Sequence, residues 1–522
     1  MCHRSRWVVL YAQPVTILPE LVASDLGYWV LTIFVVHRDS GMKFEQLVSI
    51  VSSAGGPGLR VDSRRVEQGD VFIAVPGTAQ DGHDFIDKAV ARGAGYVVHE
   101  SDRGIDPIAG VEMISVEDCT QAVGVLAQAS RGYPSSQLTN LAVTGTNGKT
   151  TVAFLVRSCI EAAGYKCGLI GTVVYDTCSG QSIEASLTTP DNLIVAELSR
   201  QMVDNGAKYM MTEASSHALS QNRLAGVDFK AAAFTNLTGD HLDYHGTKDE
   251  YLRAKARLFE GLSPEATAVL NKQSAEAKTL AGTTNASIMW YAIDEPADVV
   301  AHVSSMDAGG TRFTLEARGR KIEVKLPLVG RYNVSNALAA AGLCLAAGIE
   351  PDTIAAGLSS SQAVPGRLEK VDWAGDFSVL IDYAHTDDAL KNVLAALKPL
   401  CKGKLRVVFG CGGDRDRTKR PRMARAAEEL ADFVVVTSDN PRTEQPEDII
   451  REIMTGFEHP DSAAVAVEPD REKAIGLAVS QAQKDDMLLI AGKGHETYQI
   501  IGKEKIHFSD MEVVEKCLEK LQ

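Results

Sequence analysis

The chain has 522 residues, and its 53 basic and 68 acidic side chains give a formal net charge of −15. Its 45% hydrophobic and 23% charged content is typical of a folded globular protein and excludes a disordered or collagen-like chain. The negative charge argues against a nucleic-acid-binding face, so an anionic ligand would need a local cluster of cations and backbone N–H groups. At roughly 150 residues per domain, the length predicts about three domains.

The nine cysteines predict neither a disulfide framework nor a zinc knuckle, because their number is odd and no Cys-x-x-Cys spacing occurs. A reducing cytoplasm is therefore the simplest compartment.

The first 41 residues contain only short apolar runs, Trp7–Tyr11 and Tyr28–Val36, which are flanked by prolines and acidic residues. Neither run approaches the ~18–20 apolar residues of a membrane span, and no cleavage site of a signal peptide follows them. Residues 1–41 are therefore interpreted as an N-terminal extension. It is either an upstream segment from a misplaced start codon or a membrane-associating arm, and Met42 then begins an amphipathic segment.

Three modules of alternating β and α elements follow, which predicts an α/β protein with mostly parallel sheets covered by helices. In the first module, 42–138, we expect a β-rich run after a turn within 61–75, a loop at 77–82, a helix ending within 89–94 and a strand at 96–98. In the second, 139–363, we expect strands at 141–144, 209–212, 231–234 and 266–270. In the third, 364–522, we expect strands at 379–381, 406–409, 433–436 and 487–490 and an amphipathic helix over 471–484.

A glycine-rich loop joins the strand at 141–144 to a helix that extends to about Ala163. Its residues are Gly145, Thr146, Asn147, Gly148, Lys149, Thr150 and Thr151. The glycines let backbone N–H groups face a polyphosphate, and the helix N-terminus adds a positive field. Lys149 would reach the terminal phosphates, and the hydroxyl of Thr150 or Thr151 would bind Mg²⁺. The loop predicts ATP binding but leaves open a metabolite ligase or kinase and a nucleotide-driven switch.

Further segments narrow this choice. They are Glu213–His217, Thr235–His245, Tyr251–Lys255, Gly330–Asn336, Val364–Glu369, Asp382–His385, Gly412–Asp416, Asp439–Arg442 and Ala491–Glu496. With the glycine-rich loop they resemble the Mur ligases, ATP-dependent amino-acid ligases of peptidoglycan precursor synthesis. The third-module segments look like the branch that adds the third residue to UDP-N-acetylmuramoyl-L-alanyl-D-glutamate. The resemblance runs from Met42 to the C-terminus.

The resemblance implies a three-domain architecture, with a central phosphate-loop domain on a parallel sheet and a Rossmann-like C-terminal domain. It also implies a two-step reaction, in which ATP phosphorylates a carboxylate and an amino group then displaces the phosphate. Lys149, Glu213, His241 and Lys255 are the implied catalytic residues. Thr150, Glu213 and His241 are implied Mg²⁺ ligands, together with a carbamate formed by CO₂ on Lys255.

Substrate contacts also come from the resemblance. Further ATP contacts fall on Asn236, Asn333, Arg367 and Asp382. The UDP end falls on Val61, Ser63, Thr78, Ala79 and Gln80, and the muramoyl-dipeptide on Thr188, Thr189, Ser215, Gln221 and Arg223. Two positions depart from the family pattern, Asp387 in place of a proline and Ala214 in place of a valine, and neither carries an implied role.

The segment Asp439–Arg442 predicts which amino acid is added. Compared with lysine, meso-diaminopimelate carries an additional distal carboxylate, and the planar guanidinium of Arg442 can bind a carboxylate bidentately. Asp439 and Asn440 could accept the distal ammonium. The implied diaminopimelate residues are Arg415, Asp439, Asn440, Pro441, Arg442, Gly492 and Glu496. Lysine would leave Arg442 unpaired, so we expect meso-diaminopimelate to be preferred.

Two alternatives remain. One is another amino-acid ligase of the same superfamily, such as folylpolyglutamate synthase, although a UDP-binding module that contains Asp62–Arg64 argues against it. The other is a nucleotide-dependent switch or scaffold of cell-wall assembly without ligase activity. The expectation is a cytoplasmic, monomeric ligase with no nucleic-acid partner and no integral membrane segment.

Overall fold

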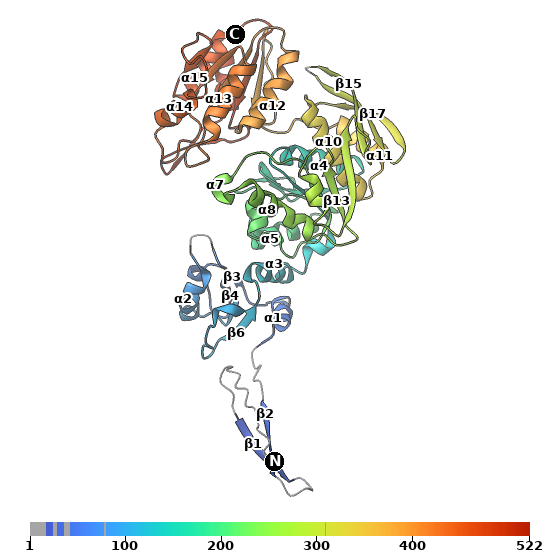
Figure 1. The fold of residues 1–522 in the computed structure, drawn as a ribbon, viewed down its shortest axis with the longest axis vertical. Coiled ribbons are helices and arrows are strands. Elements are labelled where there is room, and N and C mark those ends of the chain that lie inside the picture. The colour runs from blue at the N-terminus through green and yellow to red at the C-terminus, as the bar shows by residue number, and fades with distance from the viewer. Residues whose placement is uncertain (1–16, 24–28, 36–41, 78–79, 308, 522) are drawn as a thin grey trace, which may run out of the picture. The chain divides into compact units, whose positions relative to one another are not determined.

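The computed structural model describes residues 17–23, 29–35, 42–77, 80–307 and 309–521 (Figure 1). The chain divides into two compact units, Met1–Ala122 and Val123–Gln522, which are described separately. Within the described ranges, no helix is both long enough and apolar enough to cross a membrane.

The first unit contains a two-stranded antiparallel sheet and a four-stranded parallel sheet ordered β3-β4-β5-β6. Its elements are β1 (Ile17–Ala23), β2 (Trp29–Val35), α1 (Phe44–Val51), β3 (Leu59–Arg60), β4 (Val71–Ile73), α2 (Ile86–Ala91), β5 (Tyr96–Glu100) and β6 (Glu112–Val116). A short 3₁₀ helix, Ser63–Arg65, precedes β4 because the Asp62 carboxylate accepts the Arg64 N–H at 3.0 Å and turns the chain. Phe72 and Val97 are in the small core of this sheet.

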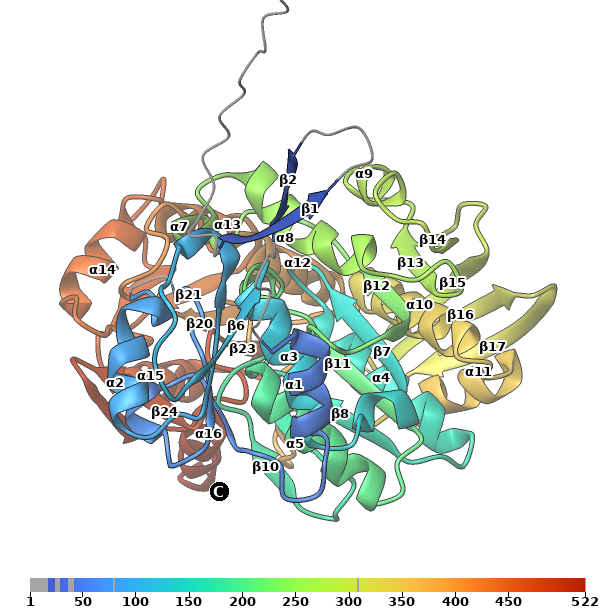
Figure 2. The same ribbon diagram turned by 90° about the horizontal axis from the view of Figure 1, so that it is seen from below.

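Helix α3 (Cys119–Ser130) spans the boundary between the units, and an eleven-stranded sheet follows it in the second unit. Its order is β10-β9-β8-β11-β7-β12-β13-β14-β15-β16-β17, and the run from β8 to β15 is parallel (Figure 2). The strands are β7 (Thr139–Thr144), β8 (Cys167–Ile170), β9 (Val174–Asp176), β10 (Ser182–Glu184), β11 (Tyr209–Glu213), β12 (Phe229–Phe234), β13 (Thr267–Asn271), β14 (Ser287–Ile293), β15 (Val299–Asp307), β16 (Gly310–Ala317) and β17 (Arg320–Leu326).

Helices cover both faces of this sheet. They are α4 (Lys149–Ala162), α5 (Asn192–Asp204), α6 (Ser216–Ser220), α7 (Leu242–His245), α8 (Lys248–Glu260), α9 (Ala277–Ala281), α10 (Arg331–Ala346) and α11 (Pro351–Ser359). Leu141 and Val143 of β7 pack with α4, α10 and α11, whereas Ala142 packs with α5, α8 and α9. The alternation follows from the two-residue period of a strand. It makes β7 a fully buried central strand that ends at the glycine-rich loop.

A six-stranded sheet of order β18-β19-β23-β20-β21-β22 forms the C-terminal part, parallel except for β18. Its elements are β18 (Glu369–Lys370), β19 (Ser378–Asp382), α12 (Asp387–Leu397), β20 (Leu405–Phe409), α13 (Lys419–Leu430), β21 (Phe433–Val436), α14 (Pro446–Met454), β22 (Val465–Val467), α15 (Arg471–Gln481), β23 (Met487–Ala491) and α16 (Asp510–Glu519). Helices α12, α13 and α14 cover one face, and α15 and α16 cover the other. A hairpin of β24 (Tyr498–Ile501) and β25 (Glu504–His507) follows β23.

The predicted strands of both larger sheets are confirmed to within a few residues, and 433–436 matches β21 at both ends. The helix predicted over 471–484 ends earlier, at Gln481, because Ala482 adopts an extended backbone. Asp387, which departs from the family pattern, is in the first turn of α12 and pairs with Arg422 at 2.9 Å. An acidic residue in the first turn of a helix is favourable, so this departure is compatible with the fold.

Candidate active site

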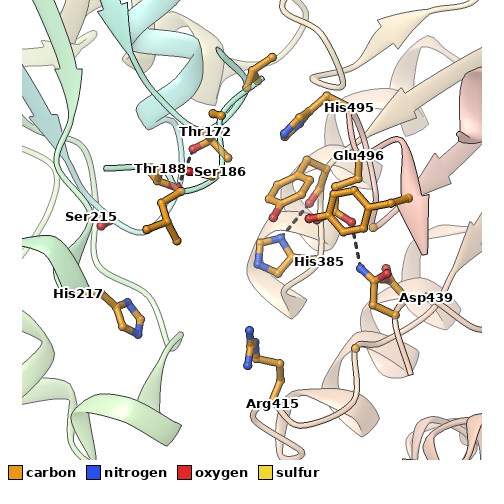
Figure 3. A pocket seen from close by; sticks show the side chains of 18 of the residues that line it. Thr172, Ser186, Thr188, Ser215, His217, His385, Arg415, Asp439, His495 and Glu496 are labelled. Atoms are coloured by element: carbon orange, nitrogen blue, oxygen red, sulfur yellow. Dashed lines mark hydrogen bonds between the residues drawn. The ribbon is translucent and has the colours of Figure 1, made fainter. Parts of the chain in front are cut away.

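Two cavities lie in the second unit at the carboxyl ends of the parallel strands, where ligands of α/β sheets collect. The loop cavity, of about 370 Å³, is lined by the glycine-rich loop, and the larger cavity measures about 760 Å³. Figure 3 shows the larger cavity, with Thr188 and Ser215 on one wall and Glu496 and Asp439 on the other. Both cavities are lined by Thr172, Thr188, Asp240, His241, Tyr383 and His385, so these residues mark where they meet.

The glycine-rich loop has a fixed backbone. Gly145 and Gly148 have φ of 150° and 91°, which favour glycine, and Gly148 is the N-cap of α4. Asn147 donates its N–H to the Asn236 side-chain oxygen at 3.0 Å, and Asn147 O accepts the Thr235 hydroxyl at 2.7 Å. Residues 146–151 line the loop cavity at the N-terminus of α4. The arrangement suits a polyphosphate.

Lys149 folds back over its own loop. Its Nζ donates to the carbonyls of Gly145 and Thr146 at 2.9 Å each, and burial lowers its pKa. A phosphate could replace these carbonyl contacts and would stabilise the charged ammonium.

Glu213 ends β11 and is fully buried below the loop. Its Oε2 accepts the hydroxyls of Thr150 at 3.0 Å and Thr172 at 2.9 Å, and its Oε1 accepts the Thr172 N–H at 2.9 Å. No cluster of three or more His, Cys, Asp or Glu side chains suited to a metal occurs among the described residues. The carboxylate and hydroxyl are nevertheless oxygen donors of the kind that Mg²⁺ prefers, and they already lie in contact.

His241 lies between the two cavities with φ of 55°. Burial lowers its pKa to about 3, so the imidazole is neutral and keeps a lone pair available to a ligand. Its Nε2 is 3.4 Å from the Asp240 carboxylate.

Lys255 is 1% exposed in α8, although a helical lysine is ordinarily solvated. Its Nζ donates to Gly145 O at 2.9 Å and lies 4.2 Å from the ring centre of Tyr251. Burial, with the nearby charge of Lys149, lowers the pKa of Lys255 well below its ordinary value. The structure thus holds a buried amine, whose charged form is disfavoured by its surroundings, directly beneath the glycine-rich loop.

The other four predicted ATP residues, Asn236, Asn333, Arg367 and Asp382, also line the loop cavity. Arg367 donates to the Thr150 hydroxyl at 3.2 Å and lies over the Tyr383 ring. Asp382 accepts the N–H groups of Leu368 at 2.7 Å and Ala384 at 2.8 Å, and burial raises its pKa. Asp382 therefore holds the backbone of the C-terminal wall, whereas Arg367 reaches the phosphate loop.

Four of the predicted muramoyl-dipeptide residues, Thr188, Thr189, Ser215 and Arg223, line the larger cavity. The Thr189 hydroxyl donates to Glu213 O at 2.6 Å, and Arg223 Nη1 donates to Thr189 O at 2.9 Å. Gln221 does not line the cavity, but its Oε1 accepts two N–H groups from Arg223 at 3.0 and 2.7 Å. Gln221 thus fixes the direction of the guanidinium.

The predicted diaminopimelate residues meet at the opposite wall, where Arg415, Asp439, Asn440, Arg442, Gly492 and Glu496 line the larger cavity. Pro441 is buried and does not line it. The Asn440 amide donates to Glu496 at 3.0 Å, and Lys493 donates to the same carboxylate at 3.0 Å. Arg442 donates to Gly413 O at 2.8 Å, and burial lowers its pKa. Cations and carboxylates therefore face one cavity, which suits a zwitterionic ligand.

The predicted UDP residues belong to the first unit. Ser63 is buried, whereas Val61 is 43% exposed and Gln80 is exposed. Thr78 and Ala79 lie outside the described residues.

Sequence reasoning assigned no role to several residues at this site. His385 and His495 lie within segments already compared with the family, but no role was given to them; both line the larger cavity, and burial lowers the pKa of each to about 4. Asp388 accepts the Asn147 side-chain amide at 3.0 Å and so joins α12 to the glycine-rich loop. Its position three residues past the Asp382–His385 segment was the available signal. Lys419 also lines the larger cavity.

Family comparisons agree with this geometry. The Mur ligase middle domain matches residues 143–344, the Mur ligase glutamate ligase domain matches 366–494, and the Mur ligase family catalytic domain matches 57–131. The chain belongs to the Mur ligase family. The matches therefore cover both cavity-forming sheets of this Mur ligase and the four-stranded sheet of its first unit.

Two curated relatives are named UDP-N-acetylmuramoyl-L-alanyl-D-glutamate–2,6-diaminopimelate ligase. The protein from Geobacillus kaustophilus is 44% identical over 88% of this chain and 94% of its own length. The one from Gloeobacter violaceus is 46% identical over 89% of this chain and 94% of its own length.

Solved structures show the same fold. A UDP-N-acetylmuramoyl-L-alanyl-D-glutamate–2,6-diaminopimelate ligase superposes with a TM-score of 0.64 at 33% identity, over 92% of this chain and 99% of its own. The folylpolyglutamate synthase of Mycobacterium tuberculosis has a TM-score of 0.58 at 21% identity, over 71% of this chain and 92% of its own. The second likeness concerns the fold alone.

Proposed function

We propose that this Mur ligase adds 2,6-diaminopimelate to UDP-N-acetylmuramoyl-L-alanyl-D-glutamate with ATP, in peptidoglycan precursor synthesis. The observation that carries the proposal is the larger cavity, which is lined by the guanidinium of Arg442, a group suited to binding a carboxylate, and by the hydroxyls of Thr188 and Ser215. Two relatives that are 44% and 46% identical to this chain are named for this reaction, and each is aligned over 94% of its own length.

The reaction proceeds in two balanced steps. A substrate carboxylate oxygen bonds to the γ-phosphorus of ATP as the bond to the β-phosphate oxygen breaks, which leaves ADP and an acyl phosphate. The neutral amino group of the amino acid then bonds to the carbonyl carbon, loses a proton and expels inorganic phosphate. The residues shared by the two cavities, among them His241 and His385, lie at the junction of the cavities, which is where the proposal brings the γ-phosphate and the carboxylate together. Both steps need positioning and charge neutralisation more than covalent help.

Thr150 and Glu213 provide the donors that would hold Mg²⁺, with neutral His241 at the junction as a further ligand. A bound Mg²⁺ neutralises phosphate charge while the phosphoryl group is transferred. Lys149 would exchange its contacts with the carbonyls of Gly145 and Thr146 for the phosphates. The Arg367 guanidinium, next to Thr150, would restrain the same phosphates from the C-terminal wall.

Lys255 is proposed to be carbamylated. An uncharged amine attacks CO₂ and releases one proton, which gives an anionic carbamate. The burial that lowers the pKa of Lys255 favours this uncharged amine over the ammonium form. The carbamate would then serve as an additional metal ligand beneath Gly145.

Arg442, with Arg415 nearby, is proposed to bind the distal carboxylate of the meso isomer, while Asp439, Asn440 and Glu496 receive its ammonium. Lysine has no distal carboxylate and would leave the half-buried guanidinium without its anion.

The remaining assignments are also proposals. They are three domains at 42–138, 139–363 and 364–522, a UDP site at Val61, Ser63 and the loop that contains Gln80, a cytoplasmic location and a monomeric state.

One experiment separates the proposal from its alternatives. Phosphate release is measured with ATP alone, with the UDP-dipeptide, and with the UDP-dipeptide plus each amino acid of a panel, and products are weighed by mass spectrometry. A ligase releases phosphate only with both co-substrates and forms the diaminopimelate-containing tripeptide. ATP hydrolysis that ignores both substrates would instead favour a nucleotide switch, and activity on a folate substrate would favour the folylpolyglutamate reaction.

A further inference from the structure

Lys419 is a buried cation at the larger cavity. It is the first residue of α13, is 6% exposed, and lines the larger cavity. Within the described part of the chain, no hydrogen bond or ion pair reaches its ammonium. Burying a charge without a partner is costly, so such a group is expected to have a ligand.

Other buried cations in the C-terminal part of the chain have hydrogen-bond partners. Arg420, the next residue, donates to Glu444 and to Glu452 at 2.8 Å. Arg471 donates to Asp510 at 2.7 Å, and Lys493 donates to Glu496 at 3.0 Å. The lack of a partner at Lys419 is therefore not a general property of buried charges in this domain.

The surroundings of Lys419 indicate which ligand it serves. Its charge acts on Asp240 and His385, two residues that line both cavities. Asp240 acts in turn on Lys149 and Lys255 below the glycine-rich loop. Lysines on helices of the central and the C-terminal sheets thus act electrostatically on one carboxylate, which lies where the cavities meet.

Other charged groups lie around Lys419. Arg415 and Asp416 line the same cavity, and the Asp416 carboxylate is occupied on one side by the N–H and hydroxyl of Thr418 at 2.8 and 2.6 Å. The N-terminus of the twelve-residue helix α13 adds a positive field at Lys419 itself. The helix end and the ammonium act together on an anion.

We propose that Lys419 is a catalytic cation that binds the phosphoryl group of the acyl phosphate. The inference rests on the proposed ligase function. As the γ-phosphorus moves from ADP to the carboxylate oxygen, Lys149 neutralises the phosphoryl oxygens from the glycine-rich loop, and Lys419 neutralises them from the C-terminal sheet. When the amino group attacks, the bond between the carbonyl carbon and the phosphate oxygen breaks, and Lys419 stabilises the departing phosphate.

Lys419→Met tests this assignment because it keeps most of the length of the unbranched side chain and removes the ammonium. Lys419→Arg restores the charge. Lys391→Met is the matched control, since Lys391 is an exposed lysine of α12 paired with Glu429 at 3.2 Å. Each purified variant is assayed with ATP, Mg²⁺, the UDP-dipeptide and diaminopimelate. Acyl phosphate is trapped in parallel with hydroxylamine, and thermal unfolding is recorded.

The expected result for Lys419→Met is a fall in kcat of about 10²- to 10³-fold, as for removal of one preorganised stabilising group. Its KM for diaminopimelate should stay within about threefold, hydroxylamine-trapped product should fall, and the unfolding midpoint should not decrease. Lys419→Arg should recover part of kcat, and Lys391→Met should match the wild type.

Three outcomes would overturn the assignment. A kcat within about threefold of the wild type would exclude a catalytic role. A raised KM for diaminopimelate with unchanged kcat would place Lys419 on the amino acid, and a lowered unfolding midpoint with the activity restored on cooling would make it structural. If the wild type itself forms no tripeptide, the proposed function fails first, which distinguishes that failure from failure of this inference.

Discussion

Replacing Arg442 with alanine should weaken the use of diaminopimelate selectively. The substitution removes the guanidinium but keeps the backbone pairing, because the Arg442 N–H donates to Ile500 O at 3.0 Å and Arg442 O accepts the Gly502 N–H at 2.7 Å. Both contacts survive in alanine, so the segment 439–442 should stay attached to the β24–β25 hairpin. The loss is then confined to the side chain and its contacts with the carbonyls of Gly413 and Asn440.

The size of the effect follows from the charged contact that is lost. A hydrogen bond to a charged group is worth about 1.5–3 kcal/mol. At 1.4 kcal/mol per factor of ten, kcat/KM for diaminopimelate should fall about 10- to 150-fold. The carboxylates of Asp439 and Glu496 remain in the cavity and would then repel the distal carboxylate, which favours the upper part of this range.

The assay is competition between diaminopimelate and lysine at limiting UDP-dipeptide, with the two tripeptides separated by mass. Arg442→Lys should be intermediate, because an ammonium keeps the charge but not the planar fork. Arg451→Ala is the control, since Arg451 is an exposed residue of α14 paired with Asp448 at 2.8 Å. The reasoning is refuted if Arg442→Ala keeps the wild-type preference, or if its KM for the UDP-dipeptide rises as much as its KM for diaminopimelate.

Three further outcomes are expected. Lys255→Ala should lose turnover, and bicarbonate should not restore it. In the wild type, activity should depend on CO₂. It should also fall as the pH drops through the lowered pKa of Lys255, because protonation removes the amine that forms the carbamate. Turnover in the variant near that of the wild type would disprove this role. Gln499→Met removes the 2.6 Å donor to Asp439 O, so KM for diaminopimelate should rise about tenfold with kcat nearly unchanged, and an unchanged KM would contradict it. Asp510→Ala should lower the free energy of unfolding by about 3–5 kcal/mol in urea, because Arg471 would stay buried and unpaired; a loss below about 1 kcal/mol would contradict that account.

Local sequence signals were sufficient for most of the fold. The strands at 141–144 and 433–436 are short apolar runs bounded by turn residues, so their burial is encoded where they occur. The end of α15 was less predictable. Ala482 is a good helix former, and only its extended backbone in the folded chain ends the helix at Gln481.

The candidate active site could likewise be predicted only in part from the sequence. The phosphate loop is a contiguous segment, so its conformation could be predicted from its glycines and neighbouring elements. The burial of Lys255 could not be predicted in this way, because the acceptor of its ammonium is Gly145 O, more than one hundred positions earlier in the chain. The contact of Asn147 with Asp388 joins residues even further apart. Neither pairing leaves a local pattern, since each depends on how separate sheets pack.

Segment 439–442, which we propose to select the amino acid, is attached to the β24–β25 hairpin. This attachment has an evolutionary consequence. Asp439, Asn440 and Arg442 are held by Gln499, Ile500 and Gly502, all from the C-terminal sheet domain, whereas the phosphate loop and Glu213 belong to the central sheet. Loops tolerate substitutions better than the helices and strands that they connect. A lineage could therefore exchange one added amino acid for another by altering a hairpin and its neighbouring loop, while the proposed phosphoryl-transfer residues stay unchanged.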